Sequence, residues 1–166
     1  MFQKYHGESW MRNKVFIGLM LFILLEGWIV TGRASVTFQQ VKQVWAKMEN
    51  SSGVHIPLYY IQDRHSNAYS TAWNVTITAG LLQDLQNADQ IAFVLGHELG
   101  HYVRQHYRQP NSMSQELQAD KLGVYYCKKL SYKKCKSFFV RAKKVYGDRG
   151  GDVHPSWTYR LKAVGE

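Results

Sequence analysis

Apolar residues recur along the first half of the folded region at spacings that predict short helices and strands. Val41, Val44 and Trp45 lie three or four residues apart, with Met48 completing the same face, and predict a helix over residues 36–48. A polar break follows this helix. Runs rich in β-branched and aromatic residues then predict strands, and a short helical stretch comes after them. The expected strands are residues 54–61, 68–70 and 75–78, and the short helix is residues 81–85.

The strongest helical pattern lies in the middle of the chain. Asn87 is a good N-cap residue, and the apolar run at residues 91–95 leads directly into the sequence HELGH at residues 97–101. This helix is apolar on most sides, so we expect it to be central and to end before Pro110.

Two more helices are expected in the C-terminal third. One begins near Ser112, where Gln115 completes a capping-box pattern, and runs to about Leu130. A basic helix over residues 132–146 follows.

The predicted fold class is therefore α+β: a small, mostly helical domain with a short antiparallel sheet, preceded by an N-terminal apolar helix. A length of 166 residues and an apolar fraction of 45% suit one globular domain.

The N-terminal stretch has the order of residues that a secretory signal has. Arg12 and Lys14 precede an uncharged apolar run at residues 15–25, and small residues follow up to Ala34. An uncleaved anchor over residues 15–30 is the alternative, although it would bring Glu26 close to the hydrocarbon. A buried helix of the domain is a third interpretation.

The predicted organisation is a signal peptide or membrane anchor at residues 1–34 and a folded domain at residues 35–166. Because the positive charges precede the apolar run, we expect an exported domain, periplasmic or membrane-anchored outside the cytoplasm. Any membrane association would run through residues 15–30.

The sequence HELGH is the H-E-x-x-H pattern of zinc hydrolases. Residues four apart share one face of a helix, so His97 and His101 can bind one metal ion. Glu98 lies at the rim of that face, where it can act as a general base without binding the metal. The central helix supplies the context that this motif requires, and the predicted cofactor is one Zn²⁺ per chain.

A third ligand has to come from another element, and Glu116 near the start of the next helix is the best candidate. Asp120 lies four residues later on the same side, where it can accept a hydrogen bond from a zinc-bound histidine. Gly123, seven residues after Glu116, keeps that face narrow where two helices approach each other.

Three motifs together resemble a known family. They are the sequence GHELGH at residues 96–101, ELQAD at residues 116–120, and His154-Pro155 followed by Arg160. The chain resembles the zinc peptidase family that includes the CAAX prenyl endopeptidase, HtpX and the BepA-type proteases, over about residues 55–162. The resemblance implies a gluzincin fold with Glu116 as third ligand. Within these 166 residues we expect no additional transmembrane bundle and no repeat domain.

The predicted activity is therefore zinc-dependent hydrolysis of peptide bonds in proteins or peptides. The resemblance, through its His-Pro motif, makes His154 a candidate second donor to the developing oxyanion. Arg160 is expected either to orient His154 or to pair with Asp120. Asn67 and its neighbours are expected to form an edge strand that pairs with an extended substrate. His106 follows the helix by more than a turn, so we expect it to point away from the metal and to cap the helix C-terminus.

The net charge of +9 is concentrated in the C-terminal third, and it leaves two other classes of function open. One is a basic interaction domain, although nucleic acid is not an expected partner because no RNA-binding motif accompanies the charge. The other is a zinc-binding, chaperone-like envelope factor without peptidase activity.

Cys127 and Cys135 would pair as a disulfide in an exported domain and stay free in a cytosolic one.

Overall fold

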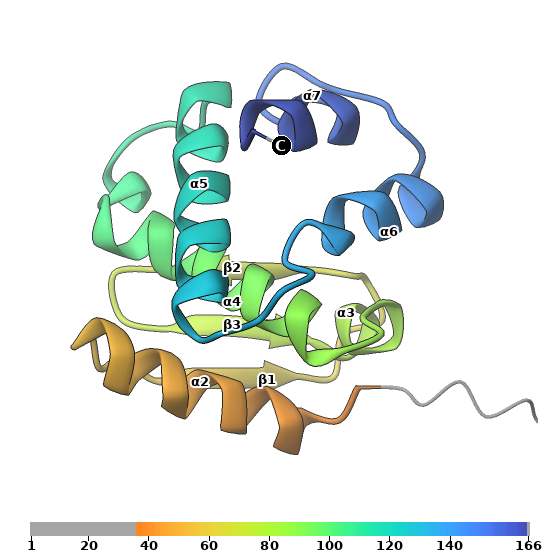
Figure 1. Cartoon of the computed structure of the whole chain (residues 1–166). Helices are drawn as coiled ribbons and strands as arrows, with labels where there is room; N and C mark the ends of the chain where they lie inside the picture. Colours follow the sequence, from red (N-terminus) through yellow and green to blue (C-terminus); the bar gives the residue numbers. More distant parts are fainter. Residues whose placement is uncertain (1–35, 166) are drawn as a thin grey trace, which may run out of the picture. The chain divides into compact units, whose positions relative to one another are not determined.

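The computed structural model describes residues 36–165 (Figure 1). The predicted signal peptide or anchor at residues 1–34, its apolar helix and the membrane association through residues 15–30 all lie outside the described residues. Within residues 36–165, no helix combines the length and the apolar character that crossing a membrane would need.

The domain combines several helices with one small sheet, which agrees with the predicted α+β class. The helices are α2 (Phe38–Ser52), α3 (Ala79–Asp84), α4 (Ala88–Val103), the 3-10 turn η1 (His106–Arg108), α5 (Met113–Lys129), α6 (Ser137–Tyr146) and α7 (Trp157–Ala163). The strands are β1 (Leu58–Ile61), β2 (Ala68–Ser70) and β3 (Val75–Thr78).

The sheet is mixed, so the prediction of an antiparallel sheet was wrong. Its strand order is β1-β3-β2, with β3 in the middle. β2 pairs with β3 antiparallel, as a tight turn between them requires, but β1 pairs with β3 parallel. The chain leaves β1, crosses to the far edge to form β2, and returns between the two strands. Strand-like patterns along the sequence do not reveal this order, because they say nothing about which strands are neighbours.

Helix α4 forms the centre of the domain, as its apolar sequence predicted. Every residue from Gln90 to Gly100 is buried, and α4 contacts α2, α5, α6 and the sheet. The four apolar residues of the first predicted helix are all buried in α2, and Phe38 at its start stacks on Tyr60 of β1. The burial of these faces against α4 and the sheet supplies the main driving force for folding.

The closest helix packing in the domain is between α4 and α5. A Cβ atom on Gly123 would lie 3.0 Å from the carbonyl oxygen of Phe93 and 3.2 Å from the amide nitrogen of His97. A Cβ atom on Gly96 would lie 3.1 Å from the Cα of Gly123. A methyl group would fit at these distances only if the two helices moved apart slightly, which agrees with the predicted role of Gly123.

The predicted helix starts of α4 and α5 are also confirmed. The side chain of Asn87 accepts a hydrogen bond from the amide of Gln90 at the start of α4. Ser112 and Gln115 form the reciprocal capping box at the start of α5. Each cap satisfies amide groups that a helix leaves unpaired at its first turn, so both helix starts are fixed by local sequence.

The C-terminal third differs from the prediction in two places. Residues 131–136 form a loop closed by a Cys127–Cys135 disulfide, so α6 begins at Ser137 and not near Tyr132. Helix α7 was not predicted, because seven residues are too few to show a hydrophobic period. Its local signal is Ser156, whose side chain accepts a hydrogen bond from the amide of Tyr159.

Candidate active site

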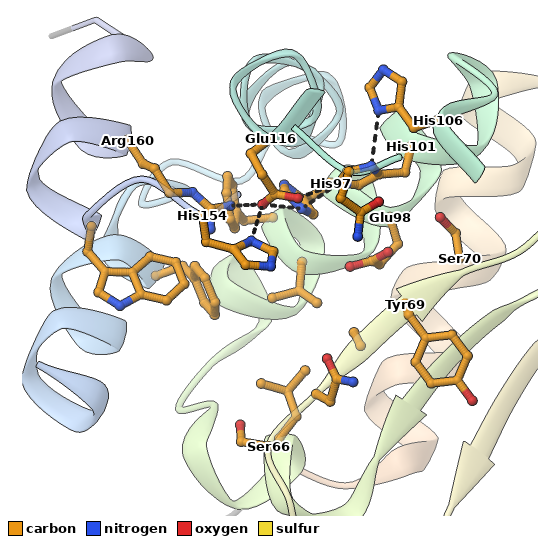
Figure 2. A pocket seen from close by; sticks show the side chains of 18 of the residues that line it. Ser66, Tyr69, Ser70, His97, Glu98, His101, His106, Glu116, His154 and Arg160 are labelled. Atoms are coloured by element: carbon orange, nitrogen blue, oxygen red, sulfur yellow. Dashed lines mark hydrogen bonds and ion pairs between the residues drawn. The ribbon is translucent and has the colours of Figure 1, made fainter. Parts of the chain in front are cut away.

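Two imidazoles and one carboxylate converge between α4 and α5 (Figure 2). His97 and His101 project from one face of α4, and their Nε2 atoms are 3.0 Å apart. Glu116, in the first turn of α5, brings Oε1 to 3.4 Å from Nε2 of His101 and Oε2 to 3.8 Å from Nε2 of His97. The structure thus brings together the three residues that the sequence suggested as metal ligands.

The donor set of these three residues fits a metal ion. One ligand atom from each of His97, His101 and Glu116 lies within 4.8 Å of the others. Asp120 accepts a hydrogen bond from Nδ1 of His97 at 3.0 Å, which places the proton of the neutral ring on Nδ1. The lone pair on Nε2 of His97 therefore points to the centre of the cluster, where it can coordinate a metal ion.

Asp120 and Arg160 form a buried ion pair behind His97. Arg160, from α7, donates from Nε to Oδ2 of Asp120 at 2.8 Å and from its terminal nitrogen to Oδ1 at 2.7 Å. Asp120 is fully buried and Arg160 nearly so. Burial opposes ionisation of Asp120, but hydrogen bonds from Arg160 and His97 outweigh it and lower the pKa of this carboxyl. Of the two roles expected for Arg160, pairing with Asp120 is the one that this geometry favours.

The carboxyl of Glu116 is held in its ionised form. Burial works against the charge, but a hydrogen bond with His101 and the nearby charges of His97 and Arg160 lower its pKa to about 2. A terminal nitrogen of Arg160 lies 3.3 Å from Oε2 of Glu116. Arg160 therefore contacts both carboxylates of α5 and holds them side by side despite their like charge.

Glu98 lies on α4 next to the cluster and faces the cleft beside β2. Its side chain is buried, and burial is the main cause that raises the pKa of this carboxyl. The charges of His97 and His101 and a hydrogen bond from Ser70 act in the opposite direction. A carboxyl with a raised pKa beside a metal-binding cluster suits a general base.

His154 lies on the opposite side of the cluster from Glu98 in Figure 2. Its side chain is 64% exposed, and its Nδ1 lies 3.3 Å from Oε2 of Glu116. His154 belongs to the loop before α7 and lines the same cleft as Glu98. The structure therefore brings this residue to the site, at the rim and not in the buried part.

A cleft of about 660 Å³ runs past these residues, with β2 along one side. β2 is an edge strand, and Asn67 directly before it hydrogen-bonds through its backbone to Thr78 of β3. Thr71 after β2 also bonds toward β3, through Asn74. By the two-residue alternation of an antiparallel pair, the amide and carbonyl groups of Ala68 and Ser70 point away from β3. The free edge of the strand therefore belongs to Ala68 and Ser70, while Asn67 lines the cleft.

His106 occupies a position that the sequence did not predict. The expectation that it points off the metal-binding face is confirmed, because it lies on the far side of His101 from Glu116, but the expected cap on α4 was wrong: His106 is buried, and its Nδ1 lies 3.0 Å from Nδ1 of His101. Burial, followed by the charge of His101, lowers the pKa of His106. His106 reaches this position because Gln105 takes a left-handed conformation with φ of 56° and turns the chain back into η1. Within residues 36–165, the remaining histidines are His55 and His65, which are exposed and outside the cluster.

The family comparison agrees with the geometry. The sequence model of Peptidase family M48 matches residues 35–114, which include Glu98 and the two histidines of α4. Over these residues the chain is similar to M48 peptidases, a family of metal-dependent peptidases, and the match indicates no particular member. It ends before Glu116, Asp120 and Arg160, so the arrangement of these residues is evidence of a separate kind. No curated protein matches the chain.

Proposed function

We propose that this protein is a zinc-dependent metalloendopeptidase that cleaves proteins or peptides in the cell envelope. The observation that carries the proposal is the convergence of His97, His101 and Glu116 beside the buried carboxyl of Glu98 on one wall of a cleft. The M48 match supports the metallopeptidase class independently.

Zinc is the metal that this donor set suits best. Two imidazole nitrogens and one carboxylate are the usual protein ligands of catalytic zinc, and three protein ligands leave one position open. A zinc ion bound here would lower the pKa of a water molecule and polarise a substrate carbonyl. Asp120 would keep His97 in the tautomer whose Nε2 is free to bind, and Arg160 would hold Asp120 in place.

Glu98 and His154 would carry out the proton transfer and charge stabilisation. Glu98 would take a proton from the attacking water and return it to the leaving amine. His154 would donate a hydrogen bond to the oxygen that becomes negatively charged, because it lines the cleft across the cluster from Glu98. In that role His154 would have to exchange its contact with Glu116 for one with the substrate.

The free edge of β2 would bind the substrate as an additional strand. Ala68 and Ser70 have amide and carbonyl groups directed away from β3, and both residues line the cleft beside Glu98. An extended peptide that pairs with them would place a backbone carbonyl next to the cluster. Main-chain pairing recognises no particular side chain, so it supports a broad range of protein substrates.

The envelope location rests on two observations. Residues 1–34 have the order of a signal peptide or anchor, and Cys127 and Cys135 form a disulfide. Disulfides persist mainly in oxidising compartments outside the cytoplasm. Tethering through residues 15–30 would keep the domain at the membrane surface.

The test combines zinc analysis with cleavage of an unstructured protein such as casein. We expect the purified full-length protein to contain about one zinc per chain and to lose cleavage in the presence of a chelator. E98Q should retain zinc and lose cleavage by about 10²–10⁴-fold, whereas E49Q, a change of the same chemistry on α2, should behave as wild type. Protein without zinc-binding capacity, or an active E98Q variant, would refute the proposal.

A further inference from the structure

The two histidines of the cluster have different partners behind them. Nδ1 of His97 meets the carboxylate of Asp120, whereas Nδ1 of His101 meets Nδ1 of His106, in both cases at 3.0 Å. His106 is 6% exposed, and its ring meets the His101 ring nearly edge-on, with an angle of 80° between their planes. Figure 2 shows His106 on the far side of His101 from Glu116.

A contact between two ring nitrogens works only if one of them carries the proton. His101 presents Nε2 to Glu116 and His97, so metal binding requires its proton to be on Nδ1. Nδ1 of His106 must then be the acceptor, and the proton of neutral His106 must be on Nε2.

The surroundings of His106 favour this tautomer. Its Nε2 lies 3.3 Å from Oε1 of Gln118 on α5, which can only accept a hydrogen bond. The amide nitrogen of Gln118 donates to the hydroxyl of Ser114 at 3.3 Å, and this contact keeps Oε1 turned towards His106. The hydrogen bonds therefore run in one direction from His101 through His106 and Gln118 to Ser114.

We propose that His106 is a positioning residue: it accepts the Nδ1 proton of His101 and so holds the Nε2 atom of His101 ready to bind the metal. The inference rests on the proposed zinc site and adds one residue to it. His106 is not itself a ligand, because both of its ring nitrogens are engaged by His101 and Gln118. It gives His101 the support that Asp120 gives His97, without a charge.

The experiment measures zinc affinity of the full-length protein by competition with a chromophoric chelator. H106L removes the acceptor and should weaken zinc binding by about 10–100-fold. H106N places a side-chain oxygen where Nδ1 was and should restore most of the affinity. Equal affinity of H106L and wild type would overturn the inference, and so would equal weakening of H106L and H106N, because a purely structural role would not distinguish the two variants.

A denaturation curve recorded with chelator present shows whether H106L folds. If it does not fold, two more variants keep the inference testable. Q118L removes the acceptor that fixes the His106 tautomer and should weaken zinc binding, whereas Q83L, the same change on α3 away from the cleft, should bind as wild type. Both changes are at exposed residues. Q118L with wild-type affinity would count against the proposal. Wild-type protein that binds no zinc would instead refute the proposed function itself.

Discussion

The two sides of the site are constructed differently. One side is the helix pair α4 and α5, which provides the three candidate ligands from two helices in very close contact. The other side is the C-terminal segment, residues 147–165, which contributes exposed His154 and buried Arg160 (Figure 1). Ligand positions thus depend on the distance between two helices, whereas the C-terminal segment supplies charge and an exposed hydrogen-bond donor. Changes on the first side should affect metal binding and folding, and changes at His154 should affect catalysis alone.

The largest effect is expected where the two sides meet. D120L removes the partner of buried Arg160, and breaking a buried ion pair from one end costs about 3–5 kcal/mol. It also removes the acceptor for His97. We expect this loss in the free energy of unfolding, measured by urea denaturation with chelator present.

The double variant D120L/R160M separates the two consequences. It removes both charges, so much of the lost stability should return, but zinc affinity should stay low because His97 still lacks its acceptor. Stability losses that simply add between D120L and R160M would show that the two residues are not coupled.

The second effect belongs to the C-terminal segment alone. H154A should lower kcat by about 10²-fold, the usual cost of losing one donor to a developing oxyanion. The side chain is 64% exposed, so the free energy of unfolding should stay within about 0.5 kcal/mol of wild type. The zinc content should be unchanged. A variant that loses zinc together with activity would place His154 among the ligands instead.

The third effect tests the helix pair. G123A puts a methyl group 3.0 Å from a backbone oxygen of α4, which α4 can relieve only by moving away. We expect the overpacking to lower the free energy of unfolding by about 1–3 kcal/mol, and the better helix propensity of alanine to offset part of this loss. Zinc binding should weaken as well. K121A, at an exposed position of α5, is the control that should change neither quantity.

The smallest effect is in the attachment of α7. Asp148 accepts hydrogen bonds from the hydroxyl and the amide of Thr158 and lies 3.1 Å from Lys143, and these contacts lower its pKa to about 2. The folded pKa is below the unfolded value, so this stabilisation is present above about pH 4 and disappears as the pH falls to about 2. D148N should therefore be slightly less stable than wild type near neutral pH, and the difference should vanish in acid. A constant difference across this range would contradict the assignment.

The sequence predicted the helix pair better than the C-terminal segment or the sheet. Helical spacing places His97 with His101 and Glu116 with Asp120, and local caps fix where α4 and α5 begin. These features depend on neighbours three or four residues apart. Pairing of Asp120 with Arg160 was one of two expectations, because their positions 40 residues apart do not fix a contact.

Other features depended on conformations that local patterns do not encode. The left-handed Gln105 reverses the chain after α4, and a non-glycine residue in this conformation gives little signal in a sequence. Its consequence is the burial of His106 against His101. The parallel pairing of β1 with β3 likewise depends on the path of the chain between them. The strand pattern was visible, but the order of the strands was not.

The glycines of the helix pair also limit how this protein can be engineered. Replacing a helical glycine with alanine is a standard way to raise thermal stability, by about 0.5–1 kcal/mol. Gly96, Gly100 and Gly123 would be the first choices by helix propensity, yet a Cβ atom at each would lie within 3.2 Å of the opposite helix. Gly151, where a Cβ atom would meet nothing within 4 Å, is open to such a change. Thermostable variants should therefore be designed in the loops and on the surface, with the α4–α5 contact left as it is.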